Sequence, residues 1–382
     1  MRINRRNFIK TTLGAGLATC GVGVLLGGCG GSLTRSDVSP TDEPDQALGA
    51  GALDDRLRSI LFYASLAPSG HNTQPWFVRL SGPNKLIIGA DPERRLPAVD
   101  PHNREVMLSI GAFTENLVLA AGNMGLKACP RVIATDPGDQ DVVDITFEKH
   151  QPSSYPLARL TQRMTVKRGY RPNDIKQDDL KYLSQPLKER LFYFPSTSSH
   201  AKCIRDGAIE NFRAQANRDD AQIETVKWMR LSNRDARRCR DGLTVAGMEI
   251  TGIKGWFVRH FVAPQTFLKP GFREQSITHT ARLAREGGGW LIITSKGHSV
   301  ADWVDAGRRF ERMALLARER NIALQPMTQY LEEAAGLQQF AAHHDARIIP
   351  QFVLRVGYLH RYPEPVSLRR PVDWFVRQET AS

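Results

Sequence analysis

Residues 68–76 read Pro-Ser-Gly-His-Asn-Thr-Gln-Pro-Trp, and this stretch carries most of the information about the fold. Segment 54–65 precedes it, and its apolar residues share one helical face: Leu57, Ile60, Leu61 and Ala64. This spacing predicts an amphipathic helix that begins at Asp54 and Asp55 and ends before Pro68. The β-rich residues 77–80 predict a strand on the other side. The intervening loop offers backbone N–H groups, a hydroxyl and amides, which suit the polar edge of a planar heterocycle.

A second polar segment, residues 163–168, reads Arg-Met-Thr-Val-Lys-Arg. In extended backbone its alternate residues point one way, as a phosphate clamp requires. Basic runs are more often solvated surface, so this segment alone does not establish a phosphate site.

Two segments repeat each other at a constant spacing of 196 residues. The matched positions are Gly111, Glu115, Leu117, Ala121, Leu126 and Pro130 in the first, and Gly307, Glu311, Met313, Ala317, Ile322 and Pro326 in the second. Both have apolar residues at helical spacing, and each follows a β-rich run, residues 86–88 and 290–294. The spacing favours a fused dimer, with one helix-and-strand unit present twice.

The loop resembles the Pro-Ser-x-x-Asn-x-Gln-Pro-Trp motif of FMN-dependent nitroreductases, and the basic segment is similar to their Arg-x-Ser/Thr-x-Lys/Arg motif. The resemblance covers about residues 53–377 and weakens through a segment of the second half. It implies an α+β fold, duplicated in one chain, with mixed sheets flanked by helices. It also implies FMN as cofactor, held by these residues: Pro68, Ser69, Gly70, His71, Asn72, Gln74, Arg163, Thr165, Lys167 and Arg168.

Two further segments carry the resemblance. Residues 325–330 are similar to the segment that brings a backbone amide to the flavin N5, which implies contacts from Met327 and Thr328. Here Thr-Gln stands where the family commonly has an acidic residue and glycine. Residues 367–371 resemble a basic tail that reaches the phosphate, which implies contacts from Arg369 and Arg370. No side chain is assigned as catalytic acid or base.

The loop motif occurs only in the first half, which we assign to residues 53–158. The clamp occurs only in the second half, residues 159–377. In dimeric nitroreductases the loop of one subunit meets the clamp of the other. The resemblance therefore implies one complete FMN site where the two halves join, with the mirror-related site lost.

Residues 200–280 are expected to be a helical insertion that has no counterpart in the first half. Within it, residues 255–272 are rich in aromatic side chains. This segment fits a lid over a flat ring system and fits helix packing equally well.

Residues 1–31 have the charged start and uncharged, Gly- and Ala-rich stretch of an export signal. The pair Arg5-Arg6 resembles a twin-arginine signal, whose machinery exports folded proteins. The sequence before and at Cys29 resembles a lipobox, which implies lipidation of Cys29. An uncleaved membrane anchor is the alternative, although the many glycines make a poor span. Residues 32–52 are expected to be a flexible linker, and the protein to be periplasmic or lipid-anchored on the outer face.

The composition narrows the class further. The net charge is +12, and removing the four leader cations leaves +8, which favours anionic ligands. The cations are scattered and match no nucleic-acid motif, so we expect no nucleic-acid partner. Three cysteines remain after the leader, without a metal or disulfide pattern. His343-His344-Asp345 lacks a third ligand at metal spacing, and residues 286–289 are expected to be a turn.

The resemblance implies a two-electron, ping-pong oxidoreductase that reduces an electron-poor small molecule, of nitroaromatic or quinone type. The nicotinamide pool is cytoplasmic, so an exported enzyme points to a quinol or a redox protein as donor, with NAD(P)H as the other candidate. A flavin-binding or flavin-sequestering protein with little turnover is the main alternative. A protein that keeps the fold without the cofactor is disfavoured, because both half-sites are present in complementary places.

Overall fold

The computed structural model describes residues 31–37, 53–345 and 348–377. The chain separates into two compact units, Met1–Gly31 and Ser32–Ser382, and the fold described below belongs to the second. The predicted export signal, with Arg5, Arg6 and Cys29, lies outside the described residues.

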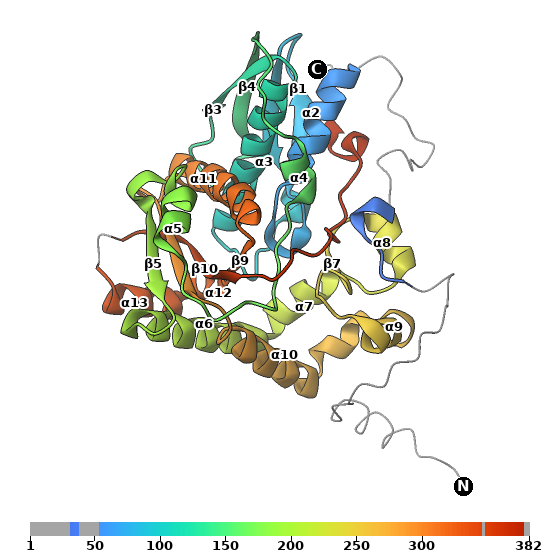
Figure 1. Cartoon of the computed structure of the whole chain (residues 1–382). Helices are drawn as coiled ribbons and strands as arrows, with labels where there is room; N and C mark the ends of the chain where they lie inside the picture. Colours follow the sequence, from blue (N-terminus) through green and yellow to red (C-terminus); the bar gives the residue numbers. More distant parts are fainter. Residues whose placement is uncertain (1–30, 38–52, 346–347, 378–382) are drawn as a thin grey trace. The chain divides into compact units, whose positions relative to one another are not determined.

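The first sheet has five strands in the order β11-β1-β2-β4-β3 (Figure 1). Its strands are β1 (Trp76–Leu80), β2 (Lys85–Ala90), β3 (Leu126–Val132), β4 (Asp141–Lys149) and the C-terminal β11 (Val376–Arg377). All pairs are antiparallel except β1 with β11, which is parallel. Its helices are α2 (Asp55–Ser65) and α3 (Arg104–Asn123), with the short turns η2 (Gly70–Asn72) and η3 (Pro92–Arg94) between strands and helices.

The second sheet has four antiparallel strands in the order β5-β8-β10-β9. Its strands are β5 (Leu191–Pro195), β8 (Gly289–Thr294), β9 (Ile322–Pro326) and β10 (Pro350–Tyr358). Its helices are α5 (Gln177–Ser184) and α11 (Val300–Glu319), and α4 (Ala158–Gln162) lies in the crossover. Without β11, the first sheet has the same strand order as the second. Apart from the helices between β5 and β8, both halves also have the same succession of helix, two strands, helix and two strands.

Helices α3 and α11 form the centre of the fold and pack along each other. A Cβ atom built on Gly111 of α3 would lie 2.1 Å from the carbonyl oxygen of Val304. One built on Gly307 of α11 would lie 2.0 Å from that of Leu108. Glycine at both positions lets the two backbones touch. One continuous core of buried apolar side chains runs through both helices and both sheets.

Five α-helices between β5 and β8 make up the expected insertion. They are α6 (Ser199–Asn217), α7 (Asp219–Lys227), α8 (Asn233–Cys239), α9 (Gly252–Phe261) and α10 (Pro270–Leu283), with β6 (Met229–Arg230), β7 (Leu243–Thr244) and η5 (Pro264–Leu268) between them. The remaining elements are η1 (Arg35–Asp37), η4 (Lys188–Arg190), α12 (Gln329–Glu332), α13 (Ala334–His343) and η6 (Val372–Trp374).

Several local predictions are confirmed. The α+β class holds, with one mixed sheet and one antiparallel sheet. Helix α2 begins as expected, because the Asp54 carboxylate accepts a hydrogen bond of 2.6 Å from the Leu57 amide. Residues 286–288 form the turn expected before β8. By length and composition α3 could cross a membrane, but most of it is buried inside the protein, as in a core helix.

Residues 32–37, the start of the predicted linker, make contacts with the folded unit. Leu33 is buried against Ala236 and Leu368, and the Arg35 amide donates to the carbonyl of Pro365 at 3.1 Å. Leu33 and Arg35 therefore tie this short stretch to the rest of the fold. Their neighbours in the sequence are polar and include proline, so the sequence does not predict these contacts. Residues 38–52 lie outside the described part of the chain.

Candidate functional site

The loop 68–76 has an unusual backbone that its own side chains stabilise. His71, Asn72 and Gln74 have φ angles of 47°, 53° and 52°, a region that non-glycine residues seldom occupy. The Ser69 hydroxyl accepts a hydrogen bond of 2.9 Å from the Gln74 amide. Backbone strain of this kind is held only where the surroundings determine it strongly, and it concentrates at functional sites.

The C-terminal tail provides part of that support. Arg369 donates to the Asn72 side-chain oxygen at 2.9 Å and to the carbonyls of Leu66 and Ala67 at 3.0 Å each. Residues almost 300 positions apart therefore meet at the end of α2. The expected neighbourhood of Asn72 and Arg369 is present in the structure.

Arg370 and Gln74 also join the tail to the loop. The Gln74 side-chain oxygen accepts from the Arg370 amide at 2.9 Å, and the guanidinium of Arg370 donates to the carbonyls of Gln74 and Trp76 at 2.7 Å each. Burial, and Arg94 nearby, lower the pKa of Arg370 to about 9. Its hydrogen bonds go to the backbone, which gives Arg370 a structural role in this state.

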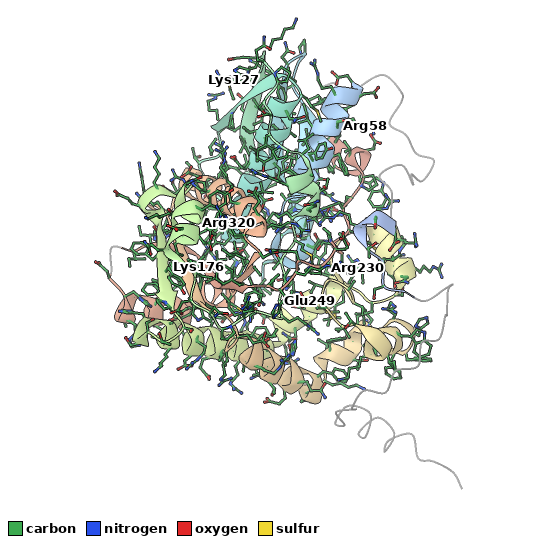
Figure 2. The ribbon with its side chains drawn as sticks, in the orientation of Figure 1. Arg58, Lys127, Lys176, Arg230, Glu249 and Arg320 are labelled. Atoms are coloured by element: carbon green, nitrogen blue, oxygen red, sulfur yellow. The ribbon has the colours of Figure 1, made fainter. Side chains whose placement is uncertain are left out.

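The predicted clamp directly follows α4 and belongs to no helix or strand, and acidic side chains lie near its cations. The buried Arg163 has its Nε atom 3.4 Å from Oε1 of Glu311, which is buried on α11. Glu249 of the insertion accepts from the Lys167 amide at 2.6 Å and from Nε of Arg168 at 2.9 Å. Thr165 lies half-buried between them. Glu249 lies on the stretch between β7 and α9, toward the middle of the view in Figure 2.

Three arginines surround Glu311. Burial lowers the pKa of Arg35 to about 10, with Arg163 the next cause, and it lowers the pKa of Arg369 well below its usual value, with Arg35 and Arg163 contributing. Burial also raises the pKa of Glu311, which Arg163 opposes. The group thus holds three guanidiniums and one carboxylate, an excess of positive charge next to the loop. Arg163 and Glu311 are buried, and Arg35 and Arg369 are partly buried.

This group also has unsatisfied hydrogen-bond donors. Within the described part of the chain, five atoms of this group are buried and have no hydrogen-bond partner: Nη2 of Arg35, Nε of Arg163, Nε of Arg369 and both carboxylate oxygens of Glu311. A buried charged donor without a partner costs free energy, and an incoming anion with several acceptor oxygens would relieve that cost. We call Arg35, Arg163, Arg369 and Glu311 the arginine cluster.

His71 connects the loop with the clamp. Burial and, to a smaller extent, the positive charge of Lys167 lower its pKa to about 4. Burial likewise lowers the pKa of Lys167. The Lys167 ammonium donates to the carbonyl of Gly247 in the insertion at 3.0 Å. The loop of the first half and the clamp of the second therefore adjoin, with residues of the insertion between them.

The third predicted segment is linked to the clamp through Arg355, which donates to the carbonyl of Lys167 and, at 2.5 Å, to the side chain of Gln325. The Met327 amide donates to the Val353 carbonyl at 2.8 Å, and its side chain lies in a separate apolar cluster. Because that amide is used within the sheet, it is not free for a flavin in this state. Thr328 follows it and precedes α12.

Three residues of this region were not predicted as site residues. Arg35 stands in the expected linker, Glu311 appears only as the repeat partner of Glu115, and Glu249 lies in the insertion. The neighbours of Arg35 in the sequence include Ser, Pro and Asp, and such a composition does not predict that this cation packs against the folded unit. The repeat could have drawn attention to Glu311, because it occupies the position that matches Glu115. In the structure, Glu115 pairs with Arg308 and Arg312, whereas Glu311 lies beside Arg163.

Other motifs stay outside the site. In the described ranges, no group of three His, Cys, Asp or Glu side chains could hold a metal ion. The three cysteines after the leader are free thiols. Within the segment 255–272, Trp256, Phe257 and Phe261 are exposed, so the insertion reaches the clamp through Gly247 and Glu249 rather than through these aromatic side chains.

Similarity to known proteins supports one class. A protein of two Mycobacterium tuberculosis strains, named as a candidate NAD(P)H nitroreductase, is 38% identical over 335 residues, which cover 84% of this chain and 90% of its own. A candidate NAD(P)H nitroreductase of a Serratia strain is 22% identical over 321 residues, covering 79% and 88%. A nitroreductase-like structure from Bacillus cereus aligns with a TM-score of 0.34 and 9% identity over 59% of this chain and 96% of its own, too weak a likeness to argue from.

No family model matches the chain. Two sheets around a central helix pair and a cation-rich candidate site beside a strained loop define an α+β protein. The Mycobacterium tuberculosis relative is 38% identical over 84% of this chain, and this similarity shows that the chain belongs to the nitroreductase family of oxidoreductases.

Proposed function

We propose that this chain is an FMN-binding oxidoreductase whose single cofactor site lies between the loop 68–76 and the clamp 163–168. The observation that carries the proposal is the arginine cluster, in which the buried Arg163 and the partly buried Arg35 and Arg369 lie near one buried carboxylate. One guanidinium nitrogen of each arginine is buried and has no hydrogen-bond partner among the described residues. A phosphate monoester brings about two negative charges and three acceptor oxygens, which this excess of charge would bind.

The residues present fit FMN. Arg163, Arg369 and Arg35 would hold the phosphate, with Thr165 and Lys167 beside it. The loop residues 69–74 would lie against the polar edge of the ring. When bound, FMN supplies the two-electron chemistry, and the protein supplies binding, orientation and electrostatics.

The duplication is part of the same proposal. The reciprocal contacts of Gly111 and Gly307 and the shared strand order support an internal repeat whose halves meet as two subunits would. The two matched glutamates differ, because Glu311 faces buried Arg163 while Glu115 faces the partly exposed Arg308 and Arg312. This asymmetry supports one site per chain rather than two.

Substrates and location are proposed as follows. The reaction transfers two electrons from a donor to an electron-poor small molecule of nitroaromatic or quinone type, in separate half-reactions. The names of the relatives favour NAD(P)H as donor, whereas export by the twin-arginine machinery would favour a quinol or a redox protein. We propose export, with Cys29 as a lipid-anchored mature end, on the leader sequence alone.

Flavin binding with little turnover is the second candidate, and one observation favours it. Gly247 and Glu249 of the insertion contact Lys167 and Arg168, so this part of the insertion covers the clamp. A covered clamp would slow exchange of the cofactor and access of substrates.

Anaerobic mixing tests the two candidates. The purified chain is loaded with FMN and mixed separately with NADH, NADPH and a soluble quinol, while flavin absorbance is followed. An oxidoreductase bleaches with at least one donor and regains its colour with a nitroaromatic or quinone. A protein that binds FMN but bleaches with none of the three fits the sequestering function, and failure to bind FMN contradicts both.

A further inference from the structure

Helix α9 carries a stripe of exposed apolar side chains. Ile253, Trp256, Phe257 and Phe261 are 87%, 45%, 43% and 65% exposed. Their spacing places them on one face of a helix, together with His260. In Figure 1, α9 lies at the edge of the insertion, apart from the two main sheets. Contiguous exposed apolar surface of this kind marks an interaction site more often than isolated residues do.

The stripe is an outward face of a well-packed helix. Its opposite face is anchored: a Cβ on Gly255 would lie 2.4 Å from the Ile250 carbonyl oxygen, and Val258 and Val262 pack on the cluster of Met229, Leu231 and Val245. The exposed rings contact each other, with centroids 5.5 Å apart for Trp256 and Phe261 and 5.3 Å for Phe257 and Phe261. The aromatic face is therefore continuous.

Basic residues predominate in the sequence around the stripe, between Glu249 and Glu274. Residues 250–273 contain four Lys and Arg residues and no Asp or Glu. Lys254 and Lys269 are exposed, Arg259 donates to the Ser32 hydroxyl at 2.5 Å, and Arg273 pairs with Asp219. A surface with Trp and Phe on one face and cations at its border is typical of helices that lie in the interface of an anionic bilayer.

The start of the described chain lies at the same place. The Arg259 guanidinium of α9 donates to the Ser32 hydroxyl, so Ser32 lies beside α9. In the sequence, residues 30 and 31 alone separate Cys29 from Ser32.

We propose that α9 is an in-plane membrane-binding helix, which inserts Ile253, Trp256, Phe257 and Phe261 into the interface of an anionic phospholipid bilayer. Lys254 and Lys269 face the lipid headgroups. The leader and α9 then act as two weak attachments, which together hold a protein more firmly than either alone. This inference does not depend on FMN, and it applies whichever side of a membrane the protein faces.

Flotation of the full chain with vesicles tests the proposal. The vesicles contain phosphatidylglycerol and phosphatidylcholine, and phosphatidylcholine alone is the comparison. Trp256→Ser with Phe261→Ser is compared with Phe192→Ser with Leu337→Ser, a matched control because Phe192 on β5 and Leu337 on α13 are 37% and 45% exposed. We expect the α9 variant to bind anionic vesicles about tenfold or more weakly, and the control to bind as the unchanged chain.

Fluorescence identifies the helix that inserts. Lipids with brominated acyl chains should quench tryptophan emission, and Trp256→Phe should remove the quenched component while it keeps vesicle binding. Equal flotation of the α9 variant and its control would overturn the proposal, because the leader alone would then account for binding. The same holds if Trp256 is unquenched, or if the α9 substitutions change self-association in place of vesicle binding.

Discussion

Gly111 of α3 and Gly307 of α11 pack reciprocally: each lies against a backbone carbonyl of the other helix, those of Val304 and Leu108. The four residues form two pairs with the same spacing of 196 positions in the chain. A contact that maps onto itself when its two sides are exchanged is the geometry of a twofold interface. The central helix pair thus resembles a dimer interface inside one chain.

The close approach at Gly307 predicts a large effect of a single methyl group. Gly307→Ala should destabilise the protein by about 1–3 kcal/mol, because the added carbon would overlap the Leu108 backbone. Gly271→Ala is the control, since nothing lies within 4 Å of a Cβ at that position in α10. Urea unfolding measures both variants. Equal stabilities would show that the helices do not pack as described.

The arginine cluster predicts selectivity for a phosphate. Arg163→Gln should weaken FMN binding about 10- to 100-fold, because a charge-assisted contact to the phosphate is lost. Riboflavin lacks the phosphate, so its affinity should change little in the same variant. Flavin fluorescence titration measures both ligands. A variant that loses both to the same extent would argue that Arg163 does not meet the phosphate.

Glu249 predicts a gain of affinity. Its carboxylate neutralises Arg168 and accepts from the Lys167 amide. Glu249→Gln keeps an acceptor at that amide and removes the negative charge, so FMN should bind several-fold more tightly, with a stronger dependence on salt. Glu274→Gln changes an exposed charge of the same insertion and should have little effect. Weaker binding by Glu249→Gln would show that the carboxylate supports the site.

His71 predicts a loss of stability in mild acid. Its folded pKa of about 4 is below the ordinary value of 6.5, so the unfolded chain binds the extra proton first. The contribution of neutral His71 is complete above about pH 6.5 and is lost as the pH falls toward 4, by at most about 1.4 kcal/mol per pH unit. His71→Gln should therefore lose less stability between pH 7 and pH 5 in urea unfolding. The exposed His102→Gln is its control, and an unchanged slope for His71→Gln would contradict the burial of His71.

Local patterns predicted much of the fold. A sequence directly displays properties of neighbouring residues, such as the Asp54 cap and the apolar face of α2. It also displays a repeat at constant spacing, such as the matched glycines of α3 and α11. The constant spacing fails beyond β9, because β4 and β10 begin at Asp141 and Pro350, after connections of unequal length. Pairing of β11 with β1 depends on contacts across the whole chain, so no local pattern indicates it.

Motifs indicated part of the candidate site, and residues that join it only through tertiary contacts were not indicated. The loop around Asn72, the clamp and the tail at Arg369 lie near one another in the structure, and their contacts with FMN stay a prediction. Arg35 and Glu249 act through burial and through distant partners, and their neighbours in the sequence give no sign of either. Arg370 was predicted as a phosphate ligand, and its guanidinium binds backbone carbonyls.

The number of FMN molecules bound per chain tests the central claim most directly. The purified full chain, freed of any flavin it carries, is titrated with FMN while flavin fluorescence is followed. One site per chain is the predicted result, since the loop and the clamp meet once. Two equivalent sites, or no binding at all, would contradict the account.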